Sequence, residues 1–178
     1  MSMHRRDVLR AAGIAFLGAG AIKPAFAFAA TEARSLAFNN LWTGEKVSVD
    51  YWAQGAYVPD ALRRIDAVLR DFRTGDVHPI EPKLLDLLCL VRRTLESDAP
   101  FEVISAFRSP KTNAMLHEKS TAVASNSLHM DGRAIDVRVP GRALSDLRAT
   151  ALSLRAGGVG YYPKDKFVHL DVGRVRNW

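Results

Sequence analysis

The chain has one cysteine, Cys89, among its 178 residues, which excludes an intramolecular disulfide. This residue lies in the apolar segment 84–91 (LLDLLCLV), where a buried core thiol is expected rather than a nucleophile or a metal ligand. A long hydrophobic run is also missing. The apolar run 11–22 has 12 residues, whereas a membrane-spanning helix needs roughly 20. We therefore expect no membrane span in the mature protein.

The N-terminus has the pattern of an export signal. Arg5 and Arg6 precede the apolar run 11–22, and small residues that suit a signal peptidase follow at 25–29 (AFAFA). Because the run is weakly hydrophobic, rich in Gly and Ala, and followed by Lys23, the pattern favours the twin-arginine route over the general secretory route. An ordinary secretory signal with a chance arginine pair is the alternative. In both cases the expected location is the periplasm.

The predicted organisation is a signal peptide at 1–29 and one domain at 30–178. Cleavage after Ala27 would leave 151 of the 178 residues, which is enough for one domain with its own core. The signal contains four basic residues and one acidic residue, so its removal lowers the formal net charge from +6 to +3. This charge suits an anionic polymer, but no basic segment interleaved with aromatic residues remains to indicate nucleic acid.

Apolar periodicity and turn residues predict the α+β fold class, as a single compact domain with a small antiparallel sheet flanked by helices. The first helix should begin at Pro59 or Asp60 and present an apolar face as far as Phe72. The other helices are expected at about 82–95, 110–117 and 143–155. Predicted strands are a hairpin of 35–41 and 46–52, single strands at 101–105 and 134–139, and a closing hairpin of 159–162 and 167–172.

Three residues in the C-terminal half have the chemistry of a catalytic zinc site. His129 and Asp136 lie seven positions apart, and His169 follows later. Two imidazoles and one carboxylate would leave a fourth position on zinc for water, as in hydrolytic sites. Strand alternation turns Asp136 away from Ile135 and Val137, so one face of that strand is apolar and the other can bind metal. A simple hydrogen bond between His129 and Asp136 is the alternative.

The segment 127–136 (SLHMDGRAID) resembles the zinc motif Ser-x-His-x-x-Gly-x-Ala-x-Asp of the bacterial D-alanyl-D-alanine metallopeptidases. The closing segment 167–178 is similar to that of the murein endopeptidase K branch of this family. The resemblance implies a fold shared with the hedgehog signalling domain. It also implies one Zn²⁺ per chain, with His129, Asp136 and His169 as its ligands.

The segment 105–110 (SAFRSP) resembles the Ser-Gly-Tyr-Arg-Ser segment that precedes the zinc motif in these peptidases. The resemblance implies that Arg108 faces the metal, where a guanidinium would stabilise the oxyanion formed during amide hydrolysis. A surface arginine at a helix start is the alternative. Asn113 and Ser127 also match family positions, and the resemblance implies that they shape the site and orient substrate or ligand.

An obvious proton-transfer group is missing. Relatives have a glutamate three residues before the last zinc histidine or a histidine two residues before it, but this chain has Lys166 and Phe167 there. The nearest carboxylate is Asp171, which should share a strand face with His169. Asp171 could orient the catalytic water, support His169, or exchange roles with it and bind the metal. We assign His169 to the metal and Asp171 to a catalytic or supporting role.

The function that the resemblance implies is exported, zinc-dependent hydrolysis of peptide cross-links in peptidoglycan, with the peptide stems as substrate. Two alternatives remain. The missing base favours a non-catalytic zinc domain that binds a wall or protein partner, and the third possibility is a zinc amidase or carboxypeptidase that trims wall peptides. Because a binding domain needs no oxyanion partner, Arg108 favours an enzyme. The sequence leaves open whether D-alanine–diaminopimelate or diaminopimelate–diaminopimelate bonds are cut, and we expect a monomer.

Overall fold

The computed structural model describes residues 32–120 and 123–178. The predicted signal therefore lies outside the described residues. Within these two ranges the strands form one eight-stranded sheet in the order β3-β2-β1-β4-β5-β7-β6-β8. The strands are β1 Arg34–Asn40, β2 Lys46–Ala53, β3 Ala56–Tyr57, β4 Phe101–Ser105, β5 Ala134–Arg138, β6 Gly158–Tyr162, β7 Phe167–Asp171 and β8 Arg176–Asn177. The helices are α1 Pro59–Val68, α2 Pro82–Thr94, α3 Pro110–Lys119, the 3₁₀ helix η1 Leu128–Asp131, and α4 Leu144–Leu154.

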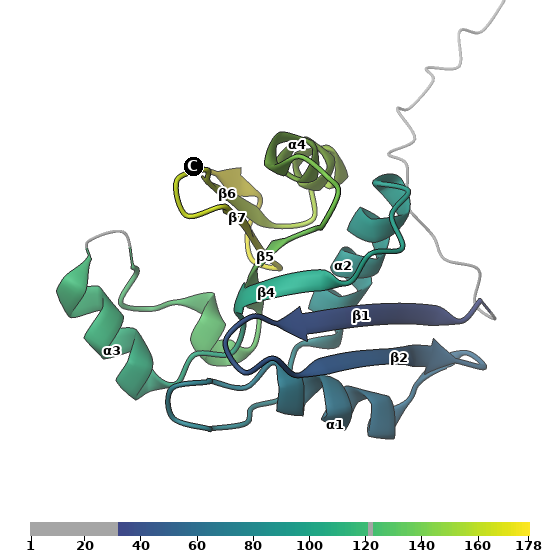
Figure 1. Ribbon diagram of the computed structural model, residues 1–178, viewed down its shortest axis with the longest axis horizontal. Helices are drawn as coiled ribbons and strands as arrows, with labels where there is room; N and C mark the ends of the chain where they lie inside the picture. Colours follow the sequence, from purple (N-terminus) through teal and green to yellow (C-terminus); the bar gives the residue numbers. More distant parts are fainter. Residues whose placement is uncertain (1–31, 121–122) are drawn as a thin grey trace, which may run out of the picture.

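Most neighbouring strands of the sheet are antiparallel, but β1 and β4 are parallel, and so are β6 and β8. A parallel pair needs a long crossover, and here the chain between β1 and β4 includes α1 and α2. As a result, the C-terminal ends of β1 and β4 lie at the same end of the sheet (Figure 1). The turn after β1 and the loop from β4 to α3 therefore lie next to each other, at the C-terminal ends of these two strands.

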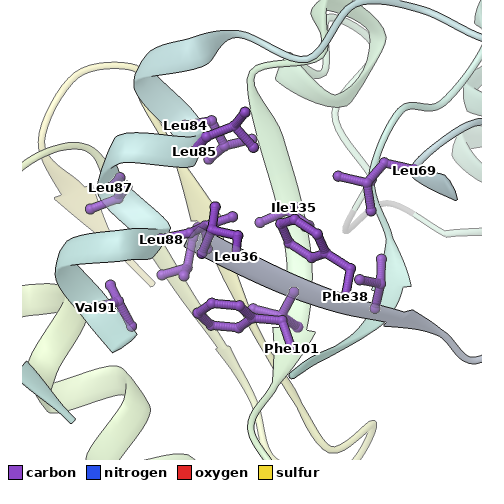
Figure 2. Packing of buried hydrophobic residues seen from close by; sticks show 14 of the residues in the cluster. Leu36, Phe38, Leu69, Leu84, Leu85, Leu87, Leu88, Val91, Phe101 and Ile135 are labelled. Carbon is purple, nitrogen blue, oxygen red and sulfur yellow. The ribbon is translucent and has the colours of Figure 1, made fainter. Parts of the chain in front are cut away.

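One hydrophobic core joins the sheet to α1, α2 and α4. Leucines of α2 pack with Leu36 and Phe38 of β1, Phe101 of β4 and Ile135 of β5 (Figure 2). These side chains are almost completely removed from water, which is the main favourable contribution to folding. The core thus fixes β5, the strand that carries Asp136, from its apolar face.

The α+β prediction is confirmed, and both predicted hairpins are present as β1–β2 and β6–β7. The sheet is larger than the predicted small antiparallel one. Its edge strands β3 and β8 have only two residues each, which is too short for a readable alternation.

The first helix is shorter than predicted. It ends at Val68, and Phe72 lies in the loop beyond it. The reason is Asp71, whose side chain accepts hydrogen bonds from the backbone and hydroxyl of Ser109, so the chain turns toward α3 instead of continuing the helix. The predicted burial of Cys89 in α2 is confirmed. In the described part of the chain, none of the helices has the length and apolar character to span a bilayer.

Candidate metal centre

Three elements bring the candidate ligands together. His129 lies on η1, Asp136 on β5 and His169 on β7. Asp136 and His169 are direct cross-strand partners, and the ligand atoms of all three residues lie within 4.8 Å of one another. The three side chains are buried. The pairing of β5 with β7 therefore unites residues that are 33 positions apart in the sequence.

The spacing of these atoms fits a tetrahedral ion. Ligands that bind zinc at about 2.1 Å lie roughly 3.4 Å from one another in a tetrahedron. Here His129 Nε2 lies 3.2 Å from His169 Nδ1 and 3.4 Å from Asp136 Oδ1. The distance between His169 Nδ1 and Asp136 Oδ1 is 2.8 Å. A small shift of one side chain would therefore give three zinc-binding atoms on one side of an ion.

The hydrogen bonds of the two imidazoles leave suitable nitrogens for a metal. His129 Nδ1 lies 2.7 Å from the carbonyl oxygen of Ala106, which can only accept a hydrogen bond. Nδ1 therefore carries the proton, and Nε2 keeps a lone pair toward the centre. Burial lowers the pKa of His129, although Asp136 opposes this, and the neutral ring is the form that binds metal.

The charge of Asp136 completes the centre. Burial alone would raise the pKa of Asp136, but its contacts with His129 and His169 hold the pKa well below the usual range. Burial alone would likewise lower the pKa of His169, yet hydrogen bonds with Asp136 and Asp171 raise it to about 9. The His169 ring thus lies between two carboxylates, and its Nδ1 faces Asp136, where a divalent cation could bind.

Local backbone geometry sets the position of His129. Gly132 ends η1 with a left-handed φ of 66°. A Cβ at this position would lie 2.3 Å from the carbonyl oxygen of Pro79, so glycine is required for both conformation and space. The backbone N–H of Arg108 also donates to the carbonyl oxygen of His129, at 3.1 Å. The segment with Arg108 and the segment with the first ligand are thereby joined.

Arg108 is a buried residue that points at the centre, as the family resemblance implies. Its guanidinium donates to Ser105 Oγ at 3.3 Å and to Asp136 Oδ2 at 3.4 Å, the carboxylate oxygen that is not directed at the histidines. Its Nε has no hydrogen-bond partner. Burial lowers the pKa of Arg108 and Asp136 opposes this. Arg108 also lines the cavity over the three candidate ligands, so a substrate oxygen there would lie beside its guanidinium.

Asp171 lies behind His169. Its Oδ2 is 3.1 Å from His169 Nε2, the ring nitrogen opposite the one that faces Asp136. Its carboxylate is 0% exposed and also accepts hydrogen bonds from Arg176 and from the backbone N–H groups of Gly158 and Gly173. Burial would raise the pKa of Asp171, but these hydrogen bonds keep it well below the usual range. Three roles were considered for Asp171. These contacts agree best with the one in which it supports His169.

A cavity of about 290 Å³ opens over the three candidate ligands. The cavity wall includes Arg108, Ser127, Tyr162, Asp165, Arg176 and Trp178. The Trp178 indole packs beside His169, with ring centroids 5.3 Å apart, and donates a hydrogen bond to the Tyr162 hydroxyl at 2.7 Å. This is a concave site with aromatic walls and a few converging polar groups, as small-molecule and peptide sites commonly are.

The two residues expected to shape the site support its wall. Ser127 lines the cavity and caps η1, where its hydroxyl accepts from the backbone N–H of His129 at 3.4 Å. Asn113 is buried on α3 and its amide donates to the carbonyl oxygens of Ala124 and Ser125. Asn113 thus holds the loop that forms one side of the cavity. Its side-chain oxygen, Oδ1, has no hydrogen-bond partner.

Sequence reasoning missed Tyr162, Arg176 and Trp178 as parts of this site. The last two lie in the closing segment that carries the family resemblance, which was the available signal. Asp165, in the turn between β6 and β7, is exposed and also lines the cavity.

Comparison with known proteins agrees with this geometry. The family model described as "Peptidoglycan L,D-endopeptidase MepK" matches residues 28–178, which include every element of the centre. The chain belongs to this family. The match confirms the predicted resemblance to the D-alanyl-D-alanine metallopeptidases, and in particular to the murein endopeptidase K branch.

Relatives match over nearly the whole chain. The peptidoglycan L,D-endopeptidase MepK of Escherichia coli (strain K12) is 40% identical over 176 residues, which cover 98% of this chain and 97% of the relative. The protein of the same name in Shigella flexneri has the same identity and coverage. The probable peptidoglycan L,D-endopeptidase MepK of Haemophilus influenzae is 42% identical over 146 residues, or 82% of this chain and 78% of the relative.

Proposed function

We propose that the chain is an exported, zinc-dependent endopeptidase that hydrolyses peptide cross-links of peptidoglycan. The observation that carries the proposal is the buried cluster of His129, Asp136 and His169 under a cavity that Arg108 also lines. Membership of a family of peptidoglycan endopeptidases agrees with it. We assign His129 Nε2, Asp136 Oδ1 and His169 Nδ1 as the zinc-binding atoms.

Zinc would supply a Lewis acid and lower the pKa of a bound water toward roughly 7. The remaining tasks belong to the chain. Arg108 is positioned to donate to the carbonyl oxygen of the substrate as negative charge develops there. Trp178 and Tyr162 form the wall beside His169 and exclude water from that side. Each of these roles is part of the proposal.

Asp171 is proposed to support His169 rather than to act as a base. A carboxylate that accepts the far N–H of a metal-binding histidine fixes its tautomer and its orientation. With four further donors on its two oxygens, Asp171 has little remaining capacity to take a proton from a water. Asn113 and Ser127 are proposed to hold the cavity wall, and through it the substrate.

The names of the relatives favour one of the two cross-links. Their L,D designation describes a bond between an L-configured carbonyl residue and a D-configured amine. A diaminopimelate–diaminopimelate link joins the carbonyl of an L centre to the amine of a D centre, whereas a D-alanine–diaminopimelate link has D centres on both sides. We therefore propose that this chain cuts the diaminopimelate–diaminopimelate bond.

The proposed location is the periplasm, reached through the twin-arginine route. Residues 1–29 lie outside the described part of the chain, so the proposal rests on their sequence pattern. The family match starts at residue 28, which supports a domain boundary at the predicted cleavage region.

Product analysis with purified mature protein tests the function. With isolated peptidoglycan that contains both cross-links, we expect diaminopimelate-linked dimers to become monomers while D-alanine-linked dimers remain. The protein should contain about one zinc per chain, and His129→Ala and Asp136→Ala should each lose zinc and activity. Exposed Asp50 on β2 offers a matched control, because Asp50→Ala should retain both.

Each alternative outcome has a clear meaning. Loss of terminal D-alanine without loss of dimers would identify a carboxypeptidase. Zinc-loaded protein that binds peptidoglycan without any change in the muropeptides would identify a binding domain. Full zinc occupancy in both ligand variants would refute the assignment of the metal centre.

A further inference from the structure

A pair of stacked aromatic rings, one of them largely exposed, contacts the segment that leads to Arg108. Trp42, in the turn after β1, is 60% exposed and stacks on Phe72 with ring centroids 4.8 Å apart and an interplanar angle of 9°. The guanidinium of Arg73 lies over the Phe72 ring at 4.2 Å. We call Trp42, Phe72 and Arg73 the aromatic platform. Its outer indole face is a flat apolar surface open to solvent.

The platform is rigid although it is exposed. The indole N–H of Trp42 donates to the carbonyl oxygen of Ile104 at 2.8 Å, and the backbone N–H of Trp42 donates to the buried side chain of Asn40 at 3.0 Å. Next to Phe72, the carboxylate of Asp71 accepts hydrogen bonds from Ser109. A freely moving surface tryptophan needs no such bonds, and these bonds fix the orientation of its open face.

Both anchors of the platform lie on the segment that contains Arg108. Trp42 is bonded to Ile104 at one end of this segment, and Asp71 is bonded to Ser109 at the other end. Parallel pairing of β1 and β4 is the cause, because it brings the ends of both strands to one edge of the sheet (Figure 1). Ser105, the residue after Ile104, is paired with Asp136. The platform therefore adjoins the end of β4 that pairs with Asp136, outside the lining of the cavity.

We propose that the aromatic platform binds the glycan strand that carries the peptide stems. This inference rests on the proposed function and adds a second contact to it. A cross-linked stem in the cavity remains attached to its sugars, which must lie on the protein surface near the cavity. The exposed indole face of Trp42, at the end of β4, is a surface on which such sugars could pack.

The chemistry of the platform favours a sugar over a peptide. Pyranose rings present flat faces of C–H groups, which pack on the electron-rich face of an indole. The indole N–H of Trp42 already donates to the carbonyl oxygen of Ile104. The open indole face therefore offers no hydrogen-bond donor to a peptide backbone.

The test compares two substrates that differ only in their sugars. One is a diaminopimelate-linked peptide dimer, and the other is the same dimer with its disaccharides attached. For Trp42→Ala we expect the KM for the sugar-bearing dimer to rise by about threefold to tenfold, with kcat unchanged, as loss of one stacking contact predicts. The sugar-free dimer should show an unchanged KM. Trp42→Phe should restore much of the difference, and Val77→Ala, another exposed apolar side chain, should have no effect.

A sugar-only probe separates this inference from the proposed function. A chitin tetrasaccharide titrated into wild-type protein should change tryptophan fluorescence in a saturable way, and Trp42→Ala should abolish the change. If wild-type protein cleaves neither dimer, the proposed function fails, and this titration alone decides the platform. An equal rise in KM for both dimers would show that Trp42 contacts the peptide, and no change for either would show that it contacts no substrate. Either result overturns the inference. Thermal melts should verify that each variant is folded.

Discussion

At the scale of single residues, the contacts of Asp171 define its role better than its position in the sequence does. Alternation along β7 turns both His169 and Asp171 to the same side, as predicted. The carboxylate then bonds the far nitrogen of the imidazole, and Arg176 holds both of its oxygens. We therefore propose that Asp171 acts on a bound metal through His169.

Replacement of this carboxylate tests the assignment. Asp171→Asn should weaken zinc binding by about 10-fold to 100-fold, because the amide cannot stabilise the N–H of His169 as a carboxylate does. Competition with a chelator of known affinity measures the change. Asp165→Asn, on the exposed rim of the cavity, is the control and should leave zinc affinity unaltered. Unchanged zinc affinity in Asp171→Asn, with turnover lower by roughly 10² to 10⁴, would instead identify Asp171 as the base.

Arg108 differs from the ligands because its loss should affect turnover more than metal. Arg108→Ala should lower kcat by on the order of 10²-fold or more, since it removes a positive donor from the position where an oxyanion forms. Zinc content, measured after dialysis, should stay near one per chain. Arg108→Lys keeps the charge but loses the directional donors, and should recover only part of the rate. Normal turnover of zinc-loaded Arg108→Ala would show that the residue is purely structural.

At the scale of elements, the N-terminus of α3 depends on one buried carboxylate in another loop. Ser109 caps the helix by accepting from the backbone N–H of Thr112, and it donates to Asp71. Burial alone would raise the pKa of Asp71, but hydrogen bonds from Thr112 and Ser109 outweigh it and lower the pKa to about 2. The pair of Asp71 and Ser109 connects the loop after α1, which contains Phe72 and Arg73 of the aromatic platform, to the segment with Arg108.

This connection predicts a pH dependence of stability. Because the pKa of Asp71 is lower in the folded chain than its ordinary value of 3.8, its ionised form stabilises the fold above pH 4. That contribution should disappear as the pH falls from about 4 to about 2. Urea unfolding at several pH values should therefore show that Asp71→Asn is less stable than wild type at pH 6, with the gap closing by pH 2.

Other carboxylates also protonate in this range, so the difference between the two proteins is the relevant quantity. Asp50→Asn, at an exposed position of β2, should run parallel to wild type at every pH. A gap between wild type and Asp71→Asn that stays constant from pH 6 to pH 2 would contradict the assigned role of this carboxylate.

At the scale of the whole molecule, the formal charge is divided between the predicted signal peptide and the domain that follows it. The first 29 residues contain half of the formal charge of +6. The domain that follows is only mildly basic, and two of its cations, Arg108 and Arg176, lie in the cavity wall. We propose that the paired arginines at the N-terminus serve export rather than substrate binding.

Export can be tested without any assay of activity. Arg5→Lys together with Arg6→Lys keeps the charge but changes the residue type that the twin-arginine transporter reads. We expect the precursor to remain in the cytoplasm, as shown by fractionation and immunoblotting. Arg10→Lys, outside the pair, should be exported normally. Periplasmic accumulation of the double variant would assign the protein to the general secretory route.

Much of the fold and part of the site were determined by the sequence alone. Helices and the longer strands are local, because their apolar periods and capping residues, such as Ser109 before Pro110, act over a few positions. The pair His129 and Asp136 was recognisable for the same reason, since both ligands lie in one loop and strand with Gly132 between them. His169 needed the family resemblance, because its distance from Asp136 along the chain carries no geometric information.

Only the tertiary structure decided which groups meet. The sequence does not state that β1 lies parallel to β4, yet this pairing brings Trp42 beside the segment of Arg108. The β5–β7 register sets Asp136 against His169, and the chain beyond β7 returns Arg176 to Asp171. Such contacts depend on burial and strand register summed over the whole domain, and no local pattern encodes them. Residue types therefore determined the available chemistry, and the fold determined the role of each residue.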